Sequence, residues 1–231
     1  MMIQKRSIKK FMIYLFVLMS LTVFWLINHN GSNNVSPLTW LRTHQEVVAT
    51  DFANQANDYL IEQEFHMPLI LQTDERWYYE PYGDEIKDNF MGINGCAIAS
   101  LAMVGSYWQN RYIEPVEIAR WADKNYYLRE QGTTWDIFSE YANAIGMQAH
   151  DLANNFEAVK YYLNLGYPVI ISVKPGFFTE VGHIMVLAQS LEGDIVVYDP
   201  NDSPEKFHYR EIFSEELFQQ ESLNYWVFKY S

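Results

Sequence analysis

The order of the apolar patterns along the chain constrains its fold more than any other feature of the sequence. Apolar residues at helical spacing come first, and short apolar runs rich in β-branched residues come mainly afterwards. The helical patterns predict helices over residues 97–108, 115–123, 134–145 and 156–165. The extended patterns predict strands over residues 67–72, 167–173, 182–188, 195–199 and 224–229. Helices followed by strands indicate an α+β fold.

The N-terminus has the pattern of a membrane-targeting segment. Residues 5–10 read KRSIKK, and residues 11–27 form a run of 17 residues without a charge. A basic start followed by such a run is typical of a secretion signal, and 17 residues are at the lower limit for a helix that spans a bilayer. The run ends without the small residues of a cleavage site, so we expect an uncleaved, single-pass anchor with the C-terminal bulk outside the cytoplasm. Cleavage, the alternative, predicts a secreted protein.

A spacer and a helix follow this predicted anchor. Residues 28–36 are polar and rich in Asn, Gly and Ser, as flexible spacers are. Apolar residues at helical spacing predict one amphipathic helix over 38–63, which either forms a stalk or packs on the main domain. The predicted organisation is a basic flank and anchor over 1–30, a spacer and stalk helix over 31–64, and a globular domain over 65–231.

Charge and cysteine content exclude several classes of function. The formal net charge is −13, and beyond residue 10 the chain has 12 basic against 29 acidic residues. Binding to phosphates needs a basic face, so we expect no nucleic-acid partner. A single cysteine excludes an intramolecular disulfide and any zinc site that needs two thiolates. Five of the six histidines, at positions 29, 44, 66, 150 and 208, show no metal-ligand spacing, and most are expected at the surface.

The one cysteine is a candidate nucleophile because of its position. Cys96 follows Gly95 and directly precedes the helix predicted over 97–108, which places its thiol at a helix N-terminus. The helix dipole and the free backbone N–H groups there lower the pKa of a thiol and can stabilise an oxyanion. A buried and inert thiol is the alternative.

A histidine and an aspartate stand at the ends of two neighbouring predicted strands. His183 opens one strand and Asp199 ends the next, and a turn near residues 192–194 joins the two strands as a hairpin. If Ser190 lies opposite residue 194, His183 faces residue 201, and Asp199 is a diagonal neighbour of the histidine on the same face. In this register the carboxylate can orient the imidazole, which can then deprotonate the thiol. Taken singly, both residues have ordinary structural explanations.

At these residues the sequence resembles the papain-like peptidases of cysteine peptidase family 39. That family includes the double-glycine leader peptidases of bacteriocin exporters, and the likeness is greater to its free-standing, exported branch. Five segments carry the resemblance: LILQTDERWYYEPYG, GINGCAIASLAMVGSYW, GTTWDIFSEYANAIG, GYPVIISVKPGFFTEVGHIMVL and IVVYDPND. The likeness extends over about residues 67–229. It implies a papain-like fold in which N-terminal helices pack on an antiparallel sheet.

The resemblance also implies roles for four residues. Cys96 corresponds to the nucleophile, His183 to the general base and acid, and Asp199 to the residue that orients the histidine. Gln72 corresponds to the side-chain donor of the oxyanion hole, although an ordinary strand-end glutamine is the alternative. Two departures from the family are Ala-Ile-Ala at 97–99, where relatives often have Gly-Pro-Thr, and the wide gap of 24 residues between Gln72 and Cys96. No metal or organic cofactor is implied, and the chain lacks a phosphate-binding loop.

The expected function is therefore peptide-bond hydrolysis by a membrane-anchored, extracytoplasmic cysteine peptidase, through a thioester with Cys96. The expected partner is a peptide or protein substrate. A related acyl-transfer enzyme, such as a cell-wall peptide amidase or a transpeptidase, would use the same three residues. A catalytically silent peptide-binding domain would keep the fold, but the loss of a catalytic residue that would favour it is not observed.

Overall fold

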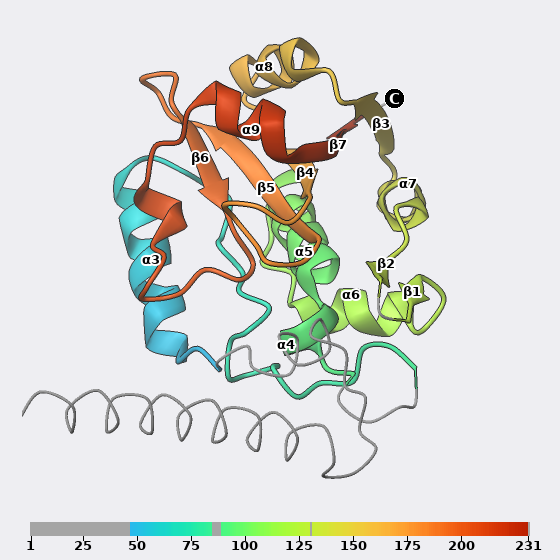
Figure 1. Ribbon diagram of the computed structural model, residues 1–231. Helices are drawn as coiled ribbons and strands as arrows, with labels where there is room; N and C mark the ends of the chain where they lie inside the picture. Colours follow the sequence, from blue (N-terminus) through green and yellow to red (C-terminus); the bar gives the residue numbers. More distant parts are fainter. Residues whose placement is uncertain (1–46, 85–88, 130, 231) are drawn as a thin grey trace, which may run out of the picture. The chain divides into compact units, whose positions relative to one another are not determined.

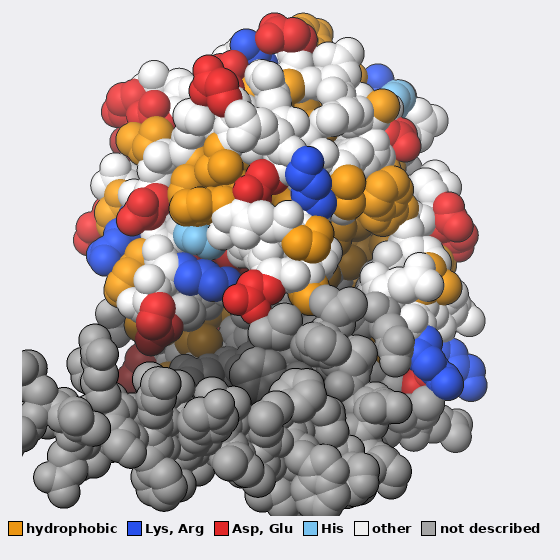
Figure 2. Space-filling model, in the orientation of Figure 1, with side chains coloured by type: hydrophobic (Ala, Val, Ile, Leu, Met, Phe, Trp, Pro, Cys, Tyr) orange, Lys and Arg blue, Asp and Glu red, His pale blue; other side chains and the backbone are white. Residues whose placement is uncertain are grey.

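The computed structural model describes residues 47–84, 89–129 and 131–230 (Figure 1). The predicted anchor and spacer lie outside the described residues. Within these three ranges, no helix has both the length and the apolar character that a membrane crossing requires. On the face drawn in Figure 2, acidic, basic and apolar side chains are interspersed.

A five-stranded antiparallel sheet forms the centre of the domain. Its strand order is β3-β7-β4-β5-β6. The strands are β3 (Gln148–Ala153), β4 (Val169–Val173), β5 (His183–Gln189), β6 (Ile195–Tyr198) and β7 (Ser222–Lys229). Every residue of the central strand β4 is buried, as its continuous apolar sequence predicts. Four of the five predicted strands are confirmed to within two residues at each end.

Helices cover both faces of this sheet. The predicted helices are confirmed as α5 (Cys96–Gln109), α6 (Pro115–Ala122), α7 (Asp136–Ala144) and α8 (Phe156–Asn164). On one face, α5, α6 and α7 form a core with alternate sheet residues such as Ile184 and Val186. On the other face, α8 and α9 (Glu215–Glu221) pack on the intervening residues, such as Met185 and Leu187. Figure 1 shows α5 on one side of the sheet and α9 on the other. The result is an α+β fold with helices packed on an antiparallel sheet.

The helix predicted over 38–63 differs from the structure in its start and is no free stalk. The helix α3 runs over Thr50–Glu62, and the residues just before it are not helical. Instead, Val48 forms a parallel bridge with Asp74. The apolar face of α3 joins the main core through Phe52, Ala53, Ala56 and Leu60. The helix therefore packs on the domain, because burying this face removes its apolar surface from water.

The strand predicted at 67–72 does not form. The Asn57 side chain on α3 accepts from Leu69 N (2.7 Å) and donates to Leu69 O (2.9 Å), and so satisfies backbone groups that a neighbouring strand would bond. Gln72 N donates to Pro200 O at 2.7 Å.

Short elements complete the fold: α4 (Met91–Asn94), β1 (Tyr127–Leu128), β2 (Gly132–Thr133) and the 3-10 turn η1 (His208–Arg210).

Candidate active site

The thiol of Cys96 lies at the first residue of α5, as predicted. The preceding turn requires glycine, because a Cβ on Gly95 would lie 2.4 Å from the carbonyl oxygen of Met91. Ala99 N donates to Gly95 O at 2.9 Å and closes the first helical turn. The backbone N–H groups of the helix before Ala99 have no partner within the helix, so they favour negative charge on the sulfur. The side chain is partly exposed.

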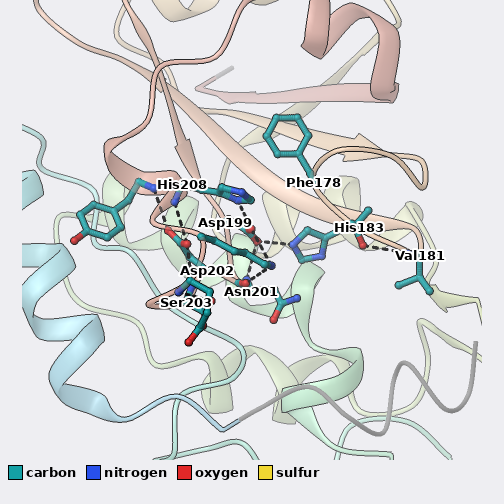
Figure 3. A network of polar contacts seen from close by, with 12 residues as sticks. Phe178, Val181, His183, Asp199, Asn201, Asp202, Ser203 and His208 are labelled. Carbon is teal, nitrogen blue, oxygen red and sulfur yellow. Dashed lines mark hydrogen bonds and ion pairs between the residues drawn. The ribbon is translucent and has the colours of Figure 1, made fainter.

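The hairpin of β5 and β6 brings His183 and Asp199 together. Ser190 N donates to Asp194 O at 2.9 Å, and Val186 pairs with Tyr198, which confirms the predicted register. At the end of the hairpin, Nε2 of His183 lies 2.6 Å from Oδ1 of Asp199 (Figure 3). The carboxylate is fully buried and the imidazole is 6% exposed. The carboxylate therefore binds the imidazole on the buried side of the ring, away from solvent.

Cys96, His183 and Gln72 line the same cleft. Its volume is about 180 Å³. One wall is formed by β2 and Trp135, and the other by the loop between β4 and β5, which contributes Thr179, Val181 and Gly182. The cleft thus joins residues from the helical layer to residues from the sheet.

The two charged partners change each other's pKa. Burial by itself raises the pKa of Asp199, but the positive charge and hydrogen bond of His183, with a further hydrogen bond from His208, hold it well below its usual value. Burial lowers the pKa of His183, but the Asp199 carboxylate and the nearby Cys96 raise it to about 9. At neutral pH the pair is therefore an imidazolium beside a carboxylate.

The imidazolium in turn acts on the thiol. Burial raises the pKa of Cys96, but its hydrogen bond to His183, the positive charge of His183 and the backbone groups of Ile184 and Ala97 together lower it. Since Nε2 of His183 is bound to Asp199, Nδ1 is the ring nitrogen left to face the sulfur. The arrangement supports a thiolate–imidazolium pair.

Gln72 is fixed next to this pair. Its side chain is 1% exposed and its Nε2 donates to Gly92 O at 2.9 Å. Its backbone is held by the segment that follows β6, so it does not end a strand as the alternative interpretation required. Gln72 lines the same cleft as Cys96.

Sequence reasoning missed one side chain that contacts the site. His208 is 7% exposed, so it is an exception to the surface position expected for most of the remaining histidines. Its Nδ1 lies 2.8 Å from Oδ2 of Asp199, and Lys206 Nζ lies 3.7 Å from the same oxygen. No periodic pattern relates these residues to Asp199 in the sequence.

Replacing Cys96 by alanine is expected to make stability fall more steeply between pH 6.5 and 9. In the variant Asp199 still raises the pKa of His183 on folding, although Cys96 no longer adds to the shift that brings this pKa to about 9 in the wild-type chain. A histidine with a raised pKa contributes stability that is fully present below pH 6.5 and is lost as the pH rises through its folded pKa. The loss is at most about 3 kcal/mol. In the wild-type chain the lowered pKa of Cys96 acts with the opposite sign, because it adds stability as the pH rises toward the ordinary thiol value.

Urea unfolding of both proteins at several pH values from 6 to 9 measures this difference. The free energy of unfolding of the wild-type chain should change less over this range than that of the variant. Equal slopes in the two proteins would contradict a charged pair between Cys96 and His183.

The sequence profile of the Peptidase_C39 like family matches residues 65–229. The peptidase domain of Streptococcus ComA, a bi-functional ABC transporter involved in a quorum-sensing pathway, is 21% identical over 66% of this chain and 99% of that chain, with a TM-score of 0.46. A C39-like peptidase from Bacillus anthracis is 16% identical over 72% of this chain and 96% of that chain, with a TM-score of 0.47. No curated protein matches the sequence.

Proposed function

The chain belongs to the Peptidase_C39-like family of cysteine peptidases, and from this premise we propose that Cys96, His183 and Asp199 are its catalytic triad. The reaction is hydrolysis of a peptide bond through a thioester with Cys96. One observation carries the proposal: the only cysteine of the chain shares a cleft with a histidine whose far nitrogen is 2.6 Å from a fully buried carboxylate.

The chemistry begins with the thiolate–imidazolium pair. The sulfur of Cys96 attacks the carbonyl carbon of the substrate, and the oxygen of that carbonyl becomes an oxyanion. The backbone N–H of Cys96 and the side-chain amide of Gln72 stabilise this charge. His183 then gives its proton to the leaving amine, the carbon–nitrogen bond breaks, and the thioester remains.

Hydrolysis of the thioester restores the enzyme. His183, now neutral, accepts a proton from a water molecule that attacks the thioester carbonyl. The carbon–sulfur bond breaks, the carboxylic acid product leaves and the thiolate–imidazolium pair forms again. Asp199 remains ionised throughout, because its role is to orient the ring and to stabilise the imidazolium.

We place the domain on the outer side of a membrane. The support is in the sequence: the basic segment at 5–10 precedes 17 uncharged residues at 11–27. The full chain should therefore stay with the membrane after alkaline washing, and protease added to intact spheroplasts should digest the domain. Recovery of the chain in the soluble fraction of the alkaline wash would argue for a cleaved signal. Protection of the domain from the added protease would contradict its proposed place outside the cytoplasm.

The function is tested by incubating the detergent-solubilised full chain with a library of unmodified peptides. Mass spectrometry should detect new peptide ends, and an acid-quenched sample should carry an acyl group on the peptide that contains Cys96. The matched control is Cys96→Ala, which should give neither signal. In a second incubation that contains an added amine, products in which this amine replaces water as the acceptor of the acyl group would indicate an acyl-transfer enzyme. Retention of peptides without cleavage would indicate a silent binding domain.

A further inference from the structure

His208 occupies the side of Asp199 opposite to His183. It lies in η1, nine residues after Asp199, and its ring Nδ1 is 2.8 Å from Oδ2 of the carboxylate. His183 binds the other oxygen, Oδ1. Figure 3 shows the carboxylate between the two imidazole rings. The buried carboxylate of Asp199 is thus contacted by two histidines, and the proposed mechanism uses only His183.

We propose that His208 is a positioning residue, which donates its Nδ1–H to Oδ2 of Asp199 and fixes the plane of the carboxylate against His183. The proposal rests on the proposed function of the triad. His208 is not among the described residues that line the cleft, so it acts on the reaction through Asp199 and not by touching the substrate.

Proton counting supports this assignment. An ionised carboxylate only accepts hydrogen bonds, so each ring nitrogen that faces Asp199 must carry a proton. His183 therefore has its proton on Nε2, and His208 has its proton on Nδ1. Asn201 N also donates to Oδ1 at 2.8 Å, and Lys206 Nζ lies 3.7 Å from Oδ2. Both oxygens are thus bound from fixed directions, and the carboxylate has no freedom to turn away from His183.

The backbone of His208 is held independently of its ring. The fully buried Asp202 accepts from His208 N and from Tyr209 N, both at 3.0 Å. These two bonds close the loop that leads from β6 to η1. Asp202 N also donates to Asp199 O at 3.0 Å, so hydrogen bonds through Asp202 connect the backbone of Asp199 to that of His208.

Aromatic side chains fix the plane of the His208 ring. Phe178 and Phe213 meet it edge-on, with ring centroids 5.7 and 5.5 Å away, and Phe177 stacks on it at 6.2 Å. Charged groups of the described residues near His208 include Asp199, Asp202, Lys206, Arg210 and His183. Glu221 accepts from the backbone N–H groups of Phe177 and Phe178. The ring is therefore oriented by packing, and its Nδ1 is aimed at the carboxylate before any substrate binds.

Two substitutions at His208 distinguish the loss of its hydrogen-bond donor from the loss of its aromatic packing. His208→Phe keeps an aromatic ring in the pocket but has no donor, whereas His208→Asn places an amide nitrogen near the position of Nδ1. In the full chain, we expect His208→Phe to slow iodoacetamide labelling of Cys96 at pH 6 about tenfold and to raise the pH of the labelling midpoint by about one unit. His208→Asn should recover most of the rate.

Phe213→Leu is the matched control, because it loosens the same aromatic pocket and leaves the donor in place. It should lower the urea midpoint without moving the labelling midpoint. If His208→Phe behaves in the same way as this control, the positioning role is overturned. A wild-type thiol with a midpoint near the ordinary value of about 8.5 would instead count against the triad itself.

A measurement on the wild-type chain covers the case in which His208→Phe fails to fold. Nitrogen-15 NMR of labelled histidine, assigned with His208→Asn, should show His208 protonated on Nδ1 in the neutral pH range. An unprotonated Nδ1 on His208 would overturn the proposal, whatever the labelling results of the variants.

Discussion

Replacing His183 by alanine is expected to slow iodoacetamide labelling of Cys96 at pH 6 by about 100-fold. The variant removes the hydrogen bond and the positive charge that lower the pKa of the thiol, while the burial that raises it remains. The midpoint of labelling should then move to the ordinary thiol value of about 8.5 or above, at which only a few thiols per thousand are ionised at pH 6. Peptide hydrolysis should fall by about 10⁴-fold, because the general base and acid is lost as well.

The single cysteine makes this measurement specific, since iodoacetamide has one thiol to label. His150→Ala is the matched control: it removes a histidine from β3, a strand at the far edge of the sheet from β5 and β6. It should leave both the labelling midpoint and the hydrolysis rate unchanged. A midpoint that stays in place in His183→Ala would show that the helix N-terminus alone activates the thiol.

Replacing Asp199 by asparagine is expected to lower the hydrolysis rate at pH 7 by at least about 100-fold. The amide keeps the shape of the side chain but not its charge. Burial lowers the pKa of His183, and without the carboxylate nothing of equal strength opposes that effect. The pKa should fall from about 9 to below the usual 6.5, so that most of the ring is neutral at pH 7. The amide also no longer holds the histidine in the tautomer and orientation that catalysis needs, and this supplies the larger part of the loss.

The pKa of His183 can be followed directly by NMR titration of its ring in the wild-type chain and in Asp199→Asn. Asp194→Asn is the control, because it removes an exposed carboxylate from the turn of the same hairpin. Its hydrolysis rate and the pKa of His183 should equal those of the wild type. A ring that still titrates near 9 in Asp199→Asn would mean that another group supplies the opposing charge.

The parts of the site that local sequence determines could be predicted. The spacing of apolar residues predicts α5 and the strands of the hairpin, and the Gly-Cys junction predicts where the helix begins. The register that the hairpin turn suggested is the one observed, although a slip by one residue was equally open in the sequence. In that register the hairpin brings His183 and Asp199 together, whereas the place of Cys96 beside them was implied by the family resemblance and depends on the packing of α5 against β5.

The parts that depend on tertiary contacts could not be predicted. The segment at 67–72 has the composition of a strand, but a side chain from α3 binds its backbone in place of a neighbouring strand. The edge strand β3 is partly exposed and polar, so no apolar run marks it. His208 reaches Asp199 through a loop in which Phe207 has a φ of 52° and Asp202 binds the backbone, and neither feature leaves a periodic signal.

The solitary thiol also determines how such an enzyme responds to oxidants. Peroxides convert an activated thiolate to a sulfenic acid, which many proteins protect by forming a disulfide with a second cysteine. Cys96 has no second cysteine in the 231 residues to form one with. Further oxidation gives a sulfinic acid, which is normally irreversible. At the proposed location outside the cytoplasm, reduction of a sulfenic acid on Cys96 would therefore depend on small thiols that enter the cleft.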